Sequence, residues 1–310
     1  MPNRSVKIVP FAEQHLDAAA ELLAARHEAQ RETFPQLPAD PDYRAEIVSL
    51  LEEGATGAYT DGAYVLGRSW TPERWGPNVW IEAAGHAARD PELLRDVWAY
   101  AATGWLEQGL TAHFVLVPAT DPQLLDAWFR LGFGAQQAHG LIDIPAREWP
   151  PTVREATEDD IEGLVEIGPL LSRHQAQSPV FSFLPEQTAD EVRADVVDDF
   201  ATEGVANLIY EEDGRIVGNF FVCPIELSSA HSGLARPPGS AFLGFAVTDP
   251  EVRGSGVGVA LTDASFAWAR REGYDVMTTD WRVTNLLSSR FWPRRGFRTT
   301  FLRLHRFVAH

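Results

Sequence analysis

The chain has 310 residues, of which 45% are hydrophobic, and its 44 acidic and 26 basic side chains give a formal net charge of −18. This length and apolar content predict one large core or two ordinary ones, and they exclude a disordered chain. The acidic balance argues against binding to nucleic acid, which depends on Lys and Arg contacts to phosphates. No stretch approaches the roughly 20 apolar residues of a membrane span.

A single cysteine, Cys223, excludes an intramolecular disulfide and is typical of a small packed apolar group. The N-terminal residues lack the apolar core of a signal peptide. We therefore expect a soluble, cytoplasmic protein that does not act at a membrane. We expect no metal, and a monomer or a homodimer.

The first half of the chain predicts a strand at residues 6–9 and a helix at residues 13–25, followed by Arg26-His27. Residues 59–62 have the composition of a hairpin turn. Further on, Asp90 before Pro91 is a typical helix start, with an N-cap carboxylate and proline at the first helical position.

The same order recurs in the second half, so the chain contains an internal repeat. Arg173-His174 follows a predicted strand at 152–155 and a helix at 158–171, 147 positions after Arg26-His27. Trp128 to Phe133 resembles Trp292 to Phe297 at an offset of 164, so the second copy is 17 residues longer (164 − 147). We place much of this excess in residues 227–240 and in a glycine-rich turn. The prolines at 150 and 151 predict two domains of one fold, residues 1–150 and 151–310.

The second copy continues with a buried strand at residues 241–247, a turn at 248–250, and a glycine-rich segment that opens a helix at 259–271. Glycine permits positive φ, and the N–H groups at a helix start attract anions, most often phosphates. A second strand at 275–280 and a short helix at 285–294 follow, and Gly296-Phe297 comes after them.

This order of strand, Arg-x-x-Gly-x-Gly, helix, strand, Asn, helix and Gly-Phe resembles the GNAT superfamily of acyl-CoA-dependent N-acyltransferases over about residues 205–305. The resemblance implies an α/β fold of the α+β type, with a mixed, mostly antiparallel central sheet flanked by helices in each of two tandem domains. It implies acetyl-CoA, or another short acyl-CoA, as co-substrate. The implied pantetheine contacts are Phe245, Ala246 and Val247, the pyrophosphate contacts are Arg253, Gly254, Ser255, Gly256, Val257 and Gly258, and Asn285 and Trp292 complete the cofactor site.

The first copy lacks this glycine-rich segment. Residues 85–91 stand in its place, and the Asp90 carboxylate lies where a phosphate would need to bind. We therefore expect residues 1–150 to be a degenerate copy that has a structural role or forms a wall of the acceptor site.

The resemblance implies direct transfer of an acetyl or short acyl group from coenzyme A to a primary amine of a small molecule or peptide, in a ternary complex. Because an amine is a cation at pH 7, a base must take its proton. Asp280 is the first candidate, since ribosomal-protein N-acetyltransferases have a Glu on the equivalent strand and the first copy has Leu116 there. Glu226 and His231 are alternatives, followed by His174, for which the repeat partner His27 favours a packing role.

Trp292 departs from the family pattern. Many members have a Tyr there that protonates the leaving thiolate, whereas an indole N–H does not titrate. Trp292 therefore packs on the pantetheine, lines the acceptor pocket, or belongs to the core like Trp128; Asn285 bonds to the pantetheine or caps the next helix. The alternative function is a non-catalytic acyl-CoA-binding or regulatory protein. The acceptor and the acyl-chain length stay open.

Overall fold

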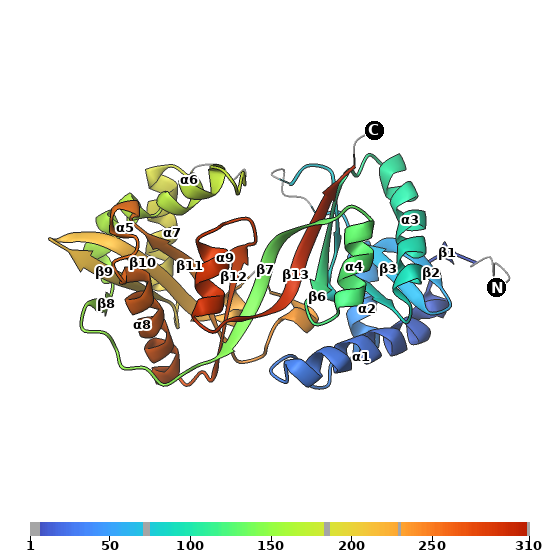
Figure 1. The fold of residues 1–310 in the computed structure, drawn as a ribbon, viewed down its shortest axis with the longest axis horizontal. Coiled ribbons are helices and arrows are strands. Elements are labelled where there is room, and N and C mark those ends of the chain that lie inside the picture. The colour runs from blue at the N-terminus through green and yellow to red at the C-terminus, as the bar shows by residue number, and fades with distance from the viewer. Residues whose placement is uncertain (1–6, 71–74, 183–186, 229–230, 309–310) are drawn as a thin grey trace. The chain divides into compact units, whose positions relative to one another are not determined.

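The computed structural model describes residues 7–70, 75–182, 187–228 and 231–308, which fall into two compact units (Figure 1). The first unit consists of residues 1–138, 232–236 and 299–310, and the second of residues 139–231 and 237–298. The units therefore differ from the predicted division after residue 150. The reason is strand pairing between residues that are distant in sequence: β13 (Arg298–Phe307) pairs antiparallel with β6 (Ala112–Pro118) of the first unit. Val6 of the predicted first strand and residues 229–230 of the predicted loop lie outside the described residues.

The first unit contains helices on either side of short strands. Besides β6 and β13, its elements are β1 (Val9–Pro10), η1 (Glu13–His15), α1 (Leu16–Thr33), α2 (Tyr43–Glu52), β2 (Thr56–Thr60), β3 (Ala63–Gly67), β4 (Asn78–Ile81), η3 (Ala83–Gly85), β5 (His86–Ala88), α3 (Pro91–Glu107), α4 (Pro122–Arg130), the start of β7 (Gly134–Asp143) and η6 (Gly233–Ala235). One sheet has the order β1-β2-β3-β5, and β4 pairs parallel with β6.

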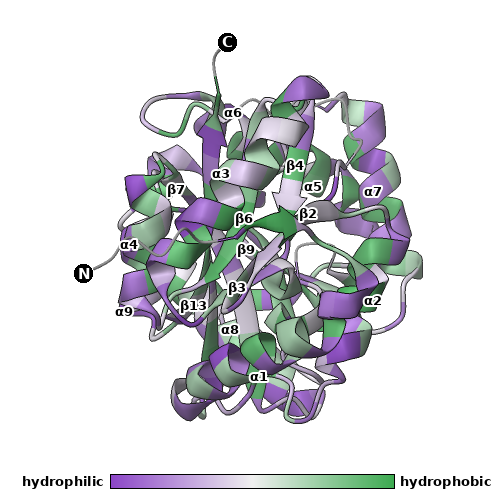
Figure 2. Ribbon diagram, turned by 90° about the vertical axis from the view of Figure 1, so that its right-hand side faces the viewer, coloured by the Kyte–Doolittle hydropathy of each residue, from purple (hydrophilic) through white to green (hydrophobic). Residues whose placement is uncertain are grey.

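The core of the first unit lies between α3, α4 and the strands. Trp98 and Trp105 of α3 and Trp128 of α4 are buried against apolar side chains of β4, β6 and β13. The colouring of Figure 2 is consistent with this, since β6 is largely hydrophobic while α1 and α2 carry both hydrophobic and hydrophilic residues. The helices are amphipathic and cover apolar strands, as expected for a layered fold.

The second unit is built around a mixed, mostly antiparallel sheet. Its elements are the end of β7, β8 (Val153–Glu155), η4 (Glu158–Asp160), α5 (Ile161–Ile167), α6 (Leu170–Ala176), α7 (Ala189–Ala201), β9 (Ala206–Glu212), β10 (Arg215–Pro224), η5 (Ile225–Leu227), β11 (Ala241–Thr248), η7 (Pro250–Val252), α8 (Val257–Arg271), β12 (Val276–Arg282) and α9 (Ser288–Arg294). The strand order from the end of β7 is β7-β12-β11-β10-β9-β8. β8 to β11 pair antiparallel and β11 pairs parallel with β12, so the predicted fold class is confirmed.

Helices cover both faces of this sheet. Residues of α5 and α7 pack with Ile209 of β9 on one face. On the other face lies α8, because a Cβ on Gly218 of β10 would meet Leu261 and Val257. Residues paired across strands share a face, so Thr248 and Ala246, opposite Gly218 and Phe220, lie on the α8 side. Phe245 and Val247 alternate with them and lie on the α5 and α7 side.

Candidate functional site

In the described part of the chain, β11 has a neighbouring strand on both sides at its start and on one side only at its end. It pairs with β10 along its whole length, from Ala241 opposite Pro224 to Thr248 opposite Gly218. The parallel ladder with β12 covers three residues only and ends at Leu243, which pairs with Thr279. Within the described chain, the edge of Gly244–Thr248 on the β12 side therefore has no strand partner. This edge presents backbone N–H and C=O groups that an extended ligand can pair with.

The ladder ends at defined side-chain contacts. The hydroxyl groups of Thr278 and Thr279 donate to the carbonyl oxygens of Ala241 and Leu243, at 3.2 Å and 2.9 Å. Directly afterwards Gly244 forms a β-bulge, since Phe221 pairs with Phe245 but Val222 pairs with Leu243. We did not predict a role for Gly244, although a glycine inside an apolar strand pattern is the usual signal of a bulge.

The glycine-rich segment adopts the backbone predicted for it. Gly254 and Gly256 have φ of 87° and 102°, which is the left-handed region, and Gly256 is the N-cap of α8. No side chain caps this helix and its first turn contains no acidic residue. The first backbone bond into the helix comes from Ala260 N to the Gly256 carbonyl, at 3.0 Å, so earlier N–H groups are directed out of the helix.

Residues 253–256 are exposed. The N–H groups of Arg253 and Ser255 donate to the carbonyl oxygens of Pro250 and Val252, so a ligand reaches those of Gly254 and Gly256. The two carboxylates just before the turn, those of Asp249 and Glu251, are both paired with Arg215, at 2.8 Å and 3.4 Å, and Asp249 also caps η7. The turn therefore has the geometry and the charge balance of an anion site.

Asn285 lies between β12 and α9 and is buried. Its side-chain oxygen accepts hydrogen bonds from the backbone N–H groups of Leu287 and Ser288, at 3.0 Å and 3.4 Å, in an Asx turn that begins α9. These hydrogen bonds agree with the second of its two expected roles, at the start of the next helix, and a contact with pantetheine stays a prediction. The Nε2 atom of His174 lies 3.4 Å from the same oxygen.

The structure gives Trp292 a packing role. Only 4% of its surface is exposed, and its ring centroid lies 4.9 Å, 5.5 Å and 5.9 Å from those of Phe291, Phe297 and Phe220. Its repeat partner Trp128 is likewise buried, in the core of the first unit. Core packing is thus one of the three roles expected for this position, and a contact between the ring and a cofactor stays a prediction.

Of the three candidate bases, Asp280 lies where the two parallel strands diverge. It follows Thr279, the last residue of β12 that pairs with β11, and its side chain is half-buried. Because Thr278 pairs with Phe242 and strand side chains alternate, Asp280 lies on the face of Phe242, which is also that of Phe245.

Glu226 and His231 have other surroundings. Glu226 is exposed in η5, which follows the end of β10 that pairs with the start of β11. His231 is 1% exposed; its Nδ1 atom lies 3.2 Å from Ser228 Oγ, and its ring centroid lies 4.5 Å from that of His139. The structure therefore brings Asp280 to the edge formed by Phe245–Val247, places Glu226 at the other end of β11, and encloses His231.

The first unit has a comparable divergence, but its own side chains fill it. β4 pairs with β6, whereas β5 pairs with β3. His86 of β5 donates through Nε2 to the Leu116 carbonyl of β6, at 2.9 Å. The buried Arg26 guanidinium donates to the carbonyl oxygens of Ala83 and His86. Burial lowers the pKa of Arg26 to about 10 and that of His86 to about 3.

The start of α3 is capped as predicted. The Asp90 carboxylate accepts a hydrogen bond from Glu92 N at 2.9 Å, and Pro91 is the first helical residue. A carboxylate thus holds the position that the uncapped glycines have in the second unit.

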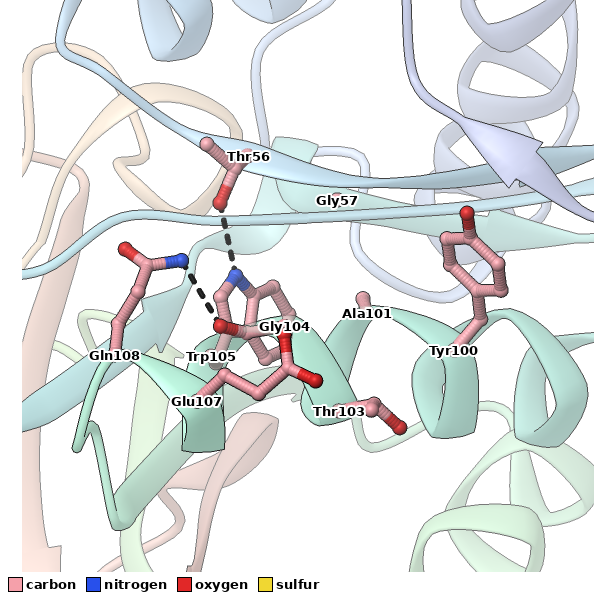
Figure 3. Close-up of a pocket in the computed structure, with 9 residues that line it drawn as sticks. All are labelled: Thr56, Gly57, Tyr100, Ala101, Thr103, Gly104, Trp105, Glu107 and Gln108. Carbon is pink, nitrogen blue, oxygen red and sulfur yellow. Dashed lines mark hydrogen bonds between the residues drawn. The ribbon is translucent and has the colours of Figure 1, made fainter.

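A pocket of about 410 Å³ lies elsewhere, between β2 and α3 of the first unit (Figure 3). Its lining includes Tyr100, Glu107 and Trp105, and Trp105 donates through Nε1 to Thr56 Oγ1 at 2.9 Å. None of the predicted site residues lines it.

Over the described residues, no helix is long and apolar enough to cross a membrane, and no group of three His, Cys, Asp or Glu side chains could hold a metal ion.

Comparisons with known proteins bear on the family and the fold of the chain. Residues 172–297 match the model of the acetyltransferase (GNAT) family. A GCN5-related N-acetyltransferase from Sphaerobacter thermophilus is 15% identical over 100% of this chain and 98% of its own, with a TM-score of 0.60. A tandem GNAT protein from the clavulanic acid biosynthesis pathway is 15% identical over 99% of both chains, with a TM-score of 0.51. No curated protein matches the sequence.

Residues 172–297 are thus similar to the acetyltransferases of the GNAT family, and the whole chain has a fold like that of the tandem GNAT protein.

Proposed function

We propose that the protein is an N-acyltransferase that moves an acetyl or short acyl group from coenzyme A to a primary amine of a small molecule or peptide. The observation that carries this proposal is that the second unit has both an open strand edge, Gly244–Thr248, and an uncapped helix start at Gly256. The open edge ends at Thr248 of β11, and Gly256 stands eight residues later at the start of α8, the next α-helix in the chain.

The residues of both features fit coenzyme A. Pantetheine has two amide groups, which can pair with the open edge as a neighbouring strand would. Ala246 directs its backbone groups to this edge, whereas those of Phe245 and Val247 are directed toward β10. The pyrophosphate fits the positive end of α8, with the N–H groups of Gly254, Gly256, Val257 and Gly258 around it. Acyl-CoA supplies an activated thioester carbonyl for attack by the amine.

Asp280 is suited to receive the amine. A half-buried carboxylate at the divergence of β11 and β12 attracts an ammonium group, and the net charge of −18 favours the approach of cations. Direct attack requires the amine and the thioester to be held together, which converts a bimolecular encounter into a positioned one.

Calorimetry with acetyl-CoA tests the proposal, because the variant Gly256→Ala introduces a Cβ where φ is 102°. We expect Gly256→Ala to weaken binding at least about tenfold, since this backbone conformation is costly for any residue with a Cβ. Gly273→Ala is a matched control at the other end of α8, with φ of 88° and, as at Gly256, no atom within 4 Å of the added Cβ. We expect it to lose similar stability and to bind normally. Equal binding by both variants would contradict the assignment of the turn.

A second function, a non-catalytic acyl-CoA-binding protein, is favoured by one observation: the non-titrating Trp292 is packed in the core. A thiol-release assay with acetyl-CoA and a panel of primary amines, peptides and aminoglycosides distinguishes the two. An enzyme releases thiol with at least one amine and loses rate in Asp280→Asn. A binding protein takes up acetyl-CoA without turnover in either form.

A further inference from the structure

The two copies of the repeat use the same histidine position differently. His27 of the first unit is fully buried, its Nε2 atom lies 2.9 Å from the Pro38 carbonyl oxygen, and its ring contacts Tyr43. His174 of the second unit is half-buried and faces Asn285. The packing role expected for His174 from its repeat partner is therefore not the role that its surroundings give it.

His174 lies close to both β11 and the segment after β12, beyond the last residues that these two strands pair. Its helix, α6, packs against β11. Its Nε2 atom lies 3.4 Å from the side-chain oxygen of Asn285, which follows β12 by three residues. The imidazole thus stands beside the open edge of β11 on which we propose that the acyl donor binds.

The contact with Asn285 defines which ring nitrogen carries hydrogen. The Asn285 oxygen is identified by the two backbone N–H groups that donate to it, and an amide oxygen is an acceptor only. The facing Nε2 atom of His174 must therefore be the donor. In the neutral ring, this tautomer leaves a lone pair on Nδ1.

We infer that His174 is the catalytic base of the proposed transfer and that Asn285 is its positioning residue. The inference rests on the proposed function. As the C–N bond forms and the C–S bond breaks, the amine proton passes to His174 Nδ1 and from there to the departing sulfur. The products are an amide and a thiol, and the imidazole returns to its neutral state. Asp280 attracts the ammonium form of the acceptor by its charge, and that ammonium loses one proton to water before the attack, so the neutral amine is the nucleophile.

Few charged side chains lie on the elements around His174. β11 contains no charged residue, and the charged side chains on α6 and β12 are Arg173, Asp280 and Arg282. Asp280 is therefore the competing proton acceptor.

Two readouts test the inference. In long-range ¹H–¹⁵N spectra of the protein without ligand, we expect the His174 signals, assigned by their loss in His174→Gln, to show the Nε2–H tautomer. For kcat/KM, we expect a fall on acidification, which forms an acidic limb, because a base that already carries a proton cannot accept one from the amine. His174→Gln keeps an N–H donor for Asn285 and lacks Nδ1. It should lower kcat about a hundredfold or more and remove this acidic limb, with acetyl-CoA binding unchanged by calorimetry.

Asn285→Asp keeps the acceptor oxygen, so we expect it to retain the acidic limb, and Gln177→Ala, at an exposed position after α6, serves as the control with unchanged kinetics. The inference is overturned if His174 is found as the Nδ1–H tautomer, if His174→Gln keeps the acidic limb, or if Asp280→Asn alone removes it. Absence of acetyl-CoA binding by the wild-type protein would instead refute the proposed function itself.

Discussion

At the scale of single residues, glycines serve two different purposes around the site. Gly256 is required for its backbone angle, since its φ of 102° is unfavourable for any residue with a side chain. Gly244 is required for space, because a Cβ there would lie 2.7 Å from the Phe242 ring. The first shapes the anion site, and the second permits the bulge after which β11 is free of β12.

Gly244→Ala tests this steric role. We expect it to cost about 1–3 kcal/mol in the free energy of unfolding, because the Phe242 ring must move within a packed core. We also expect weaker acetyl-CoA binding, since the displaced bulge changes the open edge. Urea denaturation and calorimetry measure the two effects. Gly134→Ala has no atom within 4 Å of its Cβ and should change stability by less than about 0.5 kcal/mol. A tolerated Gly244→Ala with normal binding would show that the bulge does not depend on this contact.

At the scale of elements, the two units differ at the point where neighbouring strands diverge. In the second unit the edge of β11 is open, and in the first unit Arg26 of α1 and His86 of β5 satisfy the corresponding backbone groups. A buried guanidinium is costly unless its hydrogen bonds are made, so this arrangement holds only while the carbonyl oxygens stay in place. The first unit therefore has no open edge at this position.

Arg26→Ala is expected to destabilise the first unit by about 3 kcal/mol, because it leaves the buried carbonyl oxygens of Ala83 and His86 without donors. Arg31→Ala is the matched control, since Arg31 lies on the same helix and donates to the carbonyls of Leu37 and Ala39 from a more exposed position. Thermal unfolding compares the variants. Acetyl-CoA binding should survive in folded Arg26→Ala, and its loss would mean that the cofactor site is not confined to the second unit.

Several of these elements could be predicted from the sequence because their signals are local. The glycine-rich turn, the cap at Asp90 and the strand and helix order of the second copy each depend on residues a few positions apart. The Gly244 bulge and the contacts of Arg26 depend on pairing between residues that are distant in the chain, such as Arg26 and His86. The role of Trp292 stayed open because an aromatic residue at that position suits both a core and a ligand pocket.

At the scale of the whole molecule, acid stability is set partly by buried histidines. Burial lowers the pKa of His27, His86 and His113 in the first unit, and for His86 the value is about 3. The unfolded chain binds protons at these sites below about pH 6.5, whereas the folded chain does not. Stability is therefore fully present above that pH and falls as the pH drops toward 3.

We expect His86 alone to remove about 2 kcal/mol of stability between about pH 7 and about pH 5, since each unit of pH below the free imidazole value costs about 1.4 kcal/mol. Urea denaturation at both pH values measures this. His86→Gln should reduce the difference between the two conditions, whatever its effect at neutral pH. An unchanged difference would show that His86 titrates normally in the folded state.

The division into units could not be predicted from the repeat, because a repeat records the order of elements and not their pairing partners. Residues 299–307 supply the strand beside β6, almost 190 positions after it. Consequently, on the ribosome the first half of the polypeptide cannot complete its architecture when its own codons have been read. Until the last strand has left the exit tunnel, the apolar edge of β6 lacks this partner and is open to pairing with other chains.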